Sequence, residues 1–127
     1  MEENCPCCSG KSYVECCELF HSGTINPSSA EKLMRSRYSA YAKGLVDYIF
    51  DTTHSSEQKY YSKKEIEKWS KANDWLKLEI VVSSEFIVEF KAYFRAKNQL
   101  NIQIHHERST FEIENNRWKF VSGEFDD

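Results

Sequence analysis

The chain has 127 residues, a formal net charge of −3, and a composition that is 40% hydrophobic and 29% charged. This length is typical of a single domain, and the composition excludes an intrinsically disordered chain. The lysines between residues 59 and 71 alternate with glutamates, so no dominant basic patch favours nucleic-acid binding. Because there is neither a signal-peptide pattern nor an apolar run of roughly 18 residues, we expect a cytoplasmic protein.

All five cysteines lie between residues 5 and 17. The close pair Cys5 and Cys7 is separated from a second, adjacent pair by eight residues that include the turn signal Ser9-Gly10-Lys11. In a reducing compartment, clustered cysteines bind metal more often than they form disulfides. Four thiolates close the tetrahedral shell of zinc and leave no open position for catalysis. We therefore predict one structural Zn²⁺ held by Cys5, Cys7, Cys16 and Cys17.

This spacing resembles the SEC-C motif at the tail of the SecA translocation ATPase, Cys-Pro-Cys-Gly-Ser-Gly-Lys-x-Tyr followed by Cys and then Cys or His. The chain departs from the motif at Cys8, where glycine is common. We interpret Cys8 as a spare thiol that is strained if the position needs a positive φ. Two alternatives stay open, that Cys8 replaces one of the four ligands or that His21 replaces Cys17. A histidine at such a position is more often a surface residue than a metal ligand.

A linker and a helix follow the cysteines. Residues 22–29 are rich in turn formers, and Ser28 or Ser29 is placed to cap a helix. Apolar residues three and four positions apart predict that helix from about Ala30 to Lys43, with Gly44 ending it. The chain therefore divides into two parts: a zinc-binding motif at residues 1–22 (the head) and an α+β domain at residues 28–127 (the body).

Two shorter helices and four strands complete the body. Helical spacing continues toward Thr52 or Thr53 and again over residues 63–72, and Trp69, Trp75 and Trp118 are assigned to the core. After Asp74 the apolar period changes to two, which predicts strands over 76–82 and 86–94, a third strand ending before Asn115, and a fourth that contains Trp118 and Phe120. Helices followed by hairpin-connected strands predict an α+β fold with one sheet face packed on the helices.

A run of polar residues, 105–109, lies in the third predicted strand. Ile102 and Ile104 share a strand face with His106, whereas Phe111 has the opposite parity, so we predict a β-bulge between about 105 and 110. Inward polar groups on the sheet and on the facing helix are expected to line a cavity: Arg35, Arg37, Tyr38, His106, Glu107 and Arg108. An arginine there would hold an anion, with His106 and Glu107 as an acid–base pair. The alternative, which we weigh higher, is an Arg–Glu ion pair that ties the sheet to the helix.

Nearly the whole chain resembles the YchJ-like family, through residues 33–41, Asp47-Tyr48-Ile49 with His54, Asp74-Trp75-Leu76 and residues 106–111. Members join an N-terminal SEC-C motif to a domain with an NTF2-like (cystatin-like) fold, a curved antiparallel sheet that cups helices. The resemblance therefore implies a zinc knuckle followed by this fold. The family's biochemical role is not implied by the resemblance.

Two functions fit these features. The first, which we favour, is a non-enzymatic adapter whose zinc head contacts a protein or ribosomal partner, since the SEC-C module of SecA contacts the SecB chaperone and the ribosome. The second is an NTF2-like domain or enzyme that binds a small-molecule or anionic ligand in the cavity. No catalytic residue is assigned, and no membrane partner is expected. An open sheet face would allow a homodimer.

Overall fold

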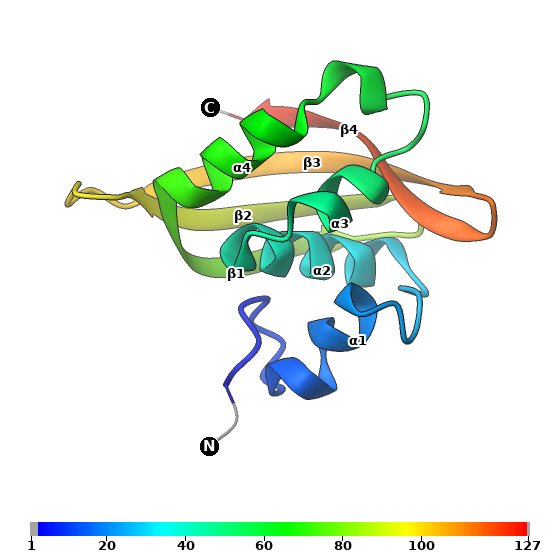
Figure 1. Ribbon diagram of the computed structural model, residues 1–127, viewed down its shortest axis with the longest axis horizontal. Helices are drawn as coiled ribbons and strands as arrows, with labels where there is room; N and C mark the ends of the chain where they lie inside the picture. Colours follow the sequence, from blue (N-terminus) through cyan, green and yellow to red (C-terminus); the bar gives the residue numbers. More distant parts are fainter. Residues whose placement is uncertain (1–2, 127) are drawn as a thin grey trace.

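The computed structural model describes residues 3–126 (Figure 1). In chain order its helical elements and strands are η1 (Tyr13–Glu15), α1 (Cys17–His21), α2 (Ala30–Lys43), α3 (Val46–Asp51), η2 (Gln58–Tyr60), α4 (Lys63–Ala72), β1 (Asn73–Ser83), β2 (Ile87–Ala96), β3 (Gln103–Glu114) and β4 (Arg117–Asp126). The strands form one antiparallel sheet in the order β1-β2-β3-β4. This confirms the predicted α+β architecture. Among the described helices, none is long and apolar enough to cross a membrane.

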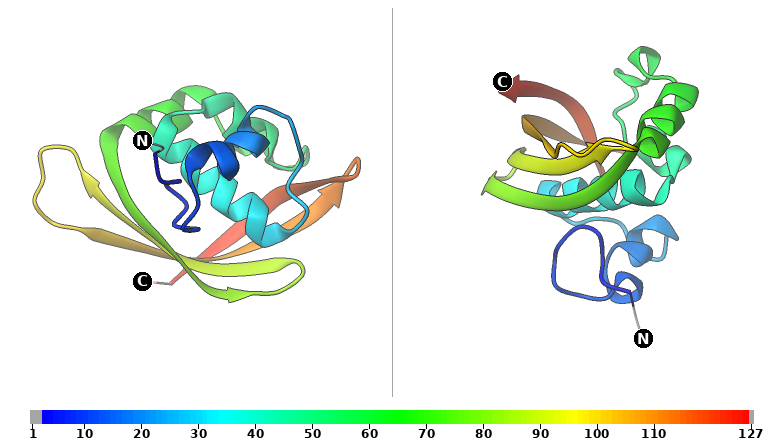
Figure 2. Two further views of the ribbon diagram at one scale, coloured as in Figure 1. Left: turned by 90° about the horizontal axis from the view of Figure 1, so that it is seen from below. Right: turned by 90° about the vertical axis from the view of Figure 1, so that its left-hand side faces the viewer.

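Helix α2 is the central element of the molecule. Ser29 caps it by accepting the Lys32 backbone N–H at 3.1 Å, and Gly44, with a φ of 72°, supplies the left-handed conformation that ends it. The helix lies between the head on one side and α3 and α4 on the other, with the sheet behind it (Figures 1 and 2). Because neighbours surround it, α2 buries almost its whole middle section, including the polar Ser36 and Ser39.

The sheet is curved because its edge strands carry extra residues. The register shifts by one residue at Leu76 and Val81 of β1 and at Val121 of β4. A β-bulge increases the local twist and bends the strand that contains it. Bulges in both edge strands therefore curl the sheet around the helices (Figure 2).

The bulge predicted within residues 105–110 lies instead in the neighbouring strand. The register does change at Thr110/Phe111, but the extra residue is Val121 of β4, and β3 keeps an unbroken alternation. The prediction was wrong because it assumed that Ile102 and Ile104 face the core. These isoleucines are 59% and 56% exposed, on the convex side of the sheet.

The core lies between α2 and the concave face of the sheet. Leu33 of α2, Val88 of β2 and Phe111 of β3 are completely buried there. Trp69, which was assigned to the core, is 49% exposed. That assignment was wrong because Trp69 lies on α4 and packs its ring edgewise against Trp75 and Phe94 at the rim of the sheet.

Candidate functional site

The head folds so that two separated cysteine pairs face each other. Cys8 and Gly10 have positive φ values of 64° and 88°, and the Cys5 N–H donates to the Lys11 carbonyl oxygen at 2.9 Å. This tight turn returns the chain toward its start. Cys16 then adopts an unusual conformation (φ −128°, ψ −109°) immediately before α1. That bend lets two adjacent residues point their side chains to the same side.

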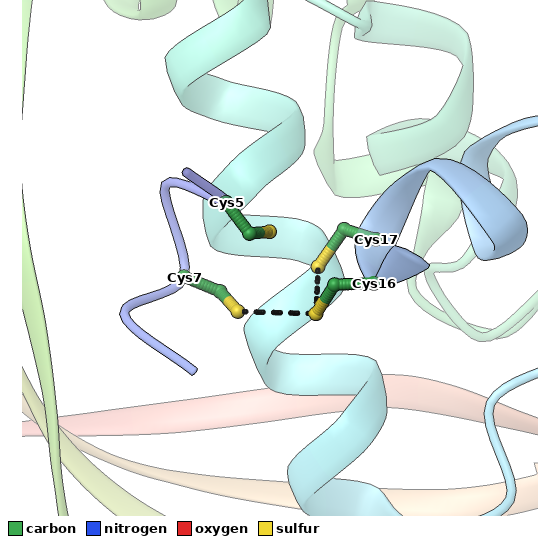
Figure 3. A group of neighbouring side chains, drawn as sticks. All are labelled: Cys5, Cys7, Cys16 and Cys17. Atoms are coloured by element: carbon green, nitrogen blue, oxygen red, sulfur yellow. Dashed lines mark hydrogen bonds between the residues drawn. The ribbon is translucent and has the colours of Figure 1, made fainter. Parts of the chain in front are cut away.

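The sulfur atoms of Cys5, Cys7, Cys16 and Cys17 lie within 4.8 Å of one another (Figure 3). The Sγ atoms of Cys7 and Cys16 are 3.7 Å apart, and those of Cys16 and Cys17 are 3.9 Å apart. A tetrahedral site with Zn–S bonds of about 2.3 Å has S–S edges of about 3.8 Å. The sulfurs therefore have the spacing of a four-thiolate metal site, and they are free thiols rather than disulfides.

The protonation of these thiols is strongly linked. The neighbouring thiols of Cys17 and Cys7 lower the pKa of Cys5, whereas hydrogen bonding with Cys5 and Cys7, together with burial, raises the pKa of Cys17. Four thiolates this close repel one another, so their full ionisation requires a cation among them. The arrangement is chemically suited to binding a divalent metal ion.

His21 and Cys8, the two alternative ligands, point elsewhere. The His21 Nε2 donates to the Ser36 carbonyl oxygen at 2.8 Å, which leaves Nδ1 to accept from the Tyr13 hydroxyl at 2.7 Å. Both ring nitrogens are thus engaged, and burial lowers the pKa of His21, which favours the neutral ring. Cys8 is exposed, outside the sulfur cluster, and its Sγ accepts the Leu78 backbone N–H of edge strand β1 at 3.5 Å.

The cysteine cluster is packed against α2 rather than held apart from the body. Arg35 donates to the Cys7 carbonyl oxygen at 2.7 Å, and the Cys5 Sγ lies 3.5 Å from the Ser39 Oγ. The buried cysteines belong to the same apolar cluster as Leu33. A metal in the head would therefore fix the position of α2 as well as that of the head.

A second feature is a cavity of about 530 Å³ on the concave side of the sheet. Helix α2, the segment from Glu57 to Trp69, and residues of all four strands surround it. Its polar lining residues include Arg37, Glu57, His105 and Glu107. Most of the remaining lining is aromatic and includes Tyr38, Tyr41, Tyr60, Tyr61, Trp69, Trp75, Phe90, Phe94, Phe120 and Phe125.

The structure divides the residues predicted to line this cavity into two groups. Arg37, Tyr38 and Glu107 line it, whereas Arg35, His106 and Arg108 do not. Arg35 lies on the side of α2 that faces the head. Because β3 keeps its alternation, His106 and Arg108 lie on the convex face, where the His106 Nε2 is 2.8 Å from the Glu89 Oε2. The predicted pairing of His106 with Glu107 as an acid–base pair is therefore corrected.

His105, which the sequence did not single out, is the histidine that contacts Glu107. The His105 Nε2 lies 2.8 Å from the Glu107 Oε1, and the Ser109 hydroxyl donates to Glu107 Oε2. Gly123 on β4 provides the space, because a Cβ there would lie 2.3 Å from Glu107 Oε2. Taking Phe111 as the inward-facing reference for strand parity would have identified His105.

Arg37, on α2, forms part of the cavity wall. Its Nη1 donates to the Ile49 carbonyl oxygen and to the Thr52 hydroxyl, both at 2.8 Å. Its guanidinium carbon stands 4.6 Å from the centre of the Phe120 ring. Burial lowers the pKa of Arg37, which is only 6% exposed.

Comparisons with known proteins identify relatives of both parts. Residues 29–123 match the family model described as the YchJ middle NTF2-like domain. The chain is 39% identical over 127 residues to a UPF0225 protein of Actinobacillus succinogenes, and the match covers 95% of this chain and 81% of that protein. A UPF0225 protein of Haemophilus influenzae is 40% identical over 126 residues, and the match covers 95% of this chain and 78% of that protein.

Two solved structures have the same fold. The solution structure of a SEC-C motif-containing protein from Rhodopseudomonas palustris is 40% identical, with a TM-score of 0.90 over 98% of this chain and 100% of that one. The crystal structure of a SEC-C motif-containing protein from Psychrobacter arcticus is 36% identical, with a TM-score of 0.81 over 93% of this chain and 80% of that one. These matches confirm the NTF2-like α+β fold and the SEC-C resemblance of the cysteine head.

Proposed function

The chain belongs to the UPF0225 family of YchJ-like proteins, and we propose that this member binds a small molecule in its concave cavity while its four-cysteine head holds a structural zinc ion. This proposal reverses the order of preference that the sequence suggested. The observation that carries it is that exposed aromatic rings surround an existing cavity.

The rim of the cavity is unusually apolar for a water-exposed surface. Tyr60, Trp69 and Phe125 are 70%, 49% and 65% exposed, and all three line the cavity. Single exposed aromatic residues are common on protein surfaces, but a group of them at one place usually marks a binding site. The cavity volume of about 530 Å³ also falls in the range of roughly 300–1,000 Å³ that is usual for small-molecule sites.

Zinc in the head supports this function indirectly. Four soft thiolate donors favour zinc, and a closed shell of four protein ligands makes the ion structural. The head contacts α2 through Arg35 and Ser39. From the same helix, Met34, Arg37, Tyr38 and Tyr41 contribute to the cavity. A metal that fixes α2 would thus hold one wall of the cavity in place.

The protein or ribosomal partner expected for the head stays a prediction, as does the homodimer. The cysteine face is packed on α2, so such a partner would contact the outer surface of the head, where Val14 is 45% exposed. No contact in the described residues identifies that partner, and the cavity is the better supported site.

The zinc proposal is tested by metal analysis of the purified protein under reducing conditions. We expect one zinc ion per chain in the wild type, a loss of stoichiometric zinc in Cys16→Ser, and one ion per chain in the matched control Cys8→Ser. Equal loss in both variants, or no metal in the wild type, would contradict the proposal.

The binding proposal is tested by screening the ¹⁵N-labelled full chain against a small-molecule fragment library by NMR. We expect hits that shift the Trp69 and Trp75 indole signals together with backbone signals of β2 and β3. A library that produces no binding, or only shifts on the convex face, would rule out the cavity as a ligand site.

A further inference from the structure

We propose that the cavity ligand is an organic anion with an aromatic or other flat apolar body, and that its carboxylate pairs with Arg37. This inference rests on the proposed small-molecule function and specifies the ligand class. It starts from a buried charge that has no ion-pair partner among the described side chains.

Arg37 is a buried cation with no ion pair in the part of the chain that the structure describes. It is 6% exposed, yet no carboxylate oxygen of residues 3–125 lies within 4.0 Å of its guanidinium nitrogens. Arginine is rarely buried to this extent without a paired anion, because removing the charge from water is costly. It is also the only lysine or arginine among the described residues that line the cavity.

The hydrogen bonds of Arg37 occupy one nitrogen only. Nη1 donates to the Ile49 carbonyl oxygen and to the hydroxyls of Thr52 and Thr53. Nε and Nη2 donate to no acceptor within residues 3–125, and neither is among the fully buried polar atoms that lack a partner. These two nitrogens form the edge of the guanidinium that binds a carboxylate through two parallel hydrogen bonds. The contacts on Nη1 fix the orientation of this edge.

Glu107 does not fill the role of this missing anion. Its negative charge acts on Arg37 from a distance, but its two oxygens contact the Ser109 hydroxyl and the His105 ring. The acceptors on Nη1 are a carbonyl group and hydroxyls, which orient the guanidinium without neutralising it. A ligand carboxylate would therefore supply the direct ion pair that no described side chain provides.

The rest of the lining sets the character of the ligand body. Phe120 lies under the Arg37 guanidinium at 4.6 Å, and Tyr41, Trp75 and Phe94 extend the apolar surface. The rings of Trp75 and Phe94 are 5.5 Å apart and inclined by 37°. Such surfaces bind flat apolar groups through stacking and edge contacts. An aromatic carboxylate matches both the cation and the rings.

The test compares three probes of the same size on the full-length protein: 2-naphthoate, the neutral 2-naphthamide and the cationic 2-naphthylmethylamine. Dissociation constants are measured by NMR titration at pH 7.5. We expect 2-naphthoate to bind about tenfold more tightly than the amide, since hydrogen bonds to a charged group contribute more than neutral ones. We expect the amine to bind more weakly than both, and the Arg37 Nε–Hε signal to shift with the carboxylate.

Two variants complete the experiment. In Arg37→Met the preference for 2-naphthoate over the amide should disappear, whereas in Arg108→Met, a matched control on the convex face, it should remain. If Arg37→Met does not fold, the charge preference of the wild type and the shift of its Nε–Hε signal decide the matter.

Two results distinguish the failure of this inference from the failure of the proposed function. Equal affinity of the carboxylate and the amide, or a carboxylate that leaves the Arg37 signal unchanged while shifting Trp75, would overturn the assignment of an anion but keep the cavity as a binding site. If neither these probes nor any library fragment shifts a cavity signal, the proposed function fails as well.

Discussion

The Arg35 side chain joins the body to the head by donating from Nη1 to the Cys7 carbonyl oxygen at 2.7 Å. Its Nε also pairs with Glu31 one turn earlier on α2, at 3.1 Å, which holds the side chain in place. The accepting carbonyl oxygen lies in the turn that carries one of the clustered cysteines. The order of that turn and the position of α2 are therefore linked through one side chain.

Arg35→Met should lower the stability of the whole chain. The substitution keeps most of the apolar stem but leaves the Cys7 carbonyl without this donor, which costs about 1–2 kcal/mol in the free energy of unfolding. Urea denaturation measures this change in the free energy of unfolding. Arg117→Met, which changes an exposed arginine at the start of β4, serves as the control and should stay within about 0.5 kcal/mol of the wild type. Equal effects of the two variants would show that the Arg35 contact is not structural.

Removing metal with a strong chelator should destabilise the body together with the head. Cys5, Cys7 and Cys17 share an apolar cluster with Leu33 and Phe111, so loosening the head removes packing from α2. A metal that is present at a thousandfold excess over its dissociation constant stabilises the folded state by about 4 kcal/mol. We expect one cooperative thermal transition that moves to lower temperature with chelator. An unchanged body transition, with the head alone becoming disordered, would contradict this coupling.

Signals that are local in the sequence predicted the helices and strands well. Ser29 and Gly44 mark the ends of α2 through their own chemistry, and the Asn115-Asn116 turn, with positive φ at both residues, separates β3 from β4. Such signals act within a few residues and need no knowledge of the fold. The clustering of the cysteines was predictable for the same reason, because the whole motif spans residues 5–17.

Features set by distant partners were not predictable in the same way. The bulge at Val121 exists because β4 must match the register of β3, and nothing in its own neighbourhood signals it. Ile102 and Ile104 look like core residues, but they lie on the convex face, which the helices do not cover. Using them as the reference for strand parity placed His106 inward instead of His105. Tyr60 and Tyr61 reach the cavity from a segment without helical or strand periodicity.

Gly123→Ala should disturb the contact between His105 and Glu107. The new Cβ would lie 2.3–2.9 Å from the outer atoms of the Glu107 side chain, so the carboxylate must move away from its present partners. Overpacking of this kind costs about 1–3 kcal/mol. Unfolding measurements on a double-mutant cycle with Glu107→Ala isolate the effect, because the alanine at 123 should be nearly neutral once the glutamate is shortened. A similar cost in both backgrounds would mean that Gly123 is needed for another reason.

His21 should make stability depend on pH below neutrality. Burial lowers the pKa of His21 from its ordinary value of 6.5, so the unfolded chain takes up a proton more readily than the folded one. The stabilising contribution of the neutral ring is therefore fully present above pH 6.5 and is lost as the pH falls through the lowered pKa. His21→Gln, which removes the titrating group, should be less stable than the wild type at pH 7.5, and this difference should shrink at pH 5.5. Measuring the difference between the two proteins at each pH cancels the protonation of the cysteines, which both contain. A difference that is constant or grows toward low pH would show that His21 is not held neutral between Tyr13 and Ser36.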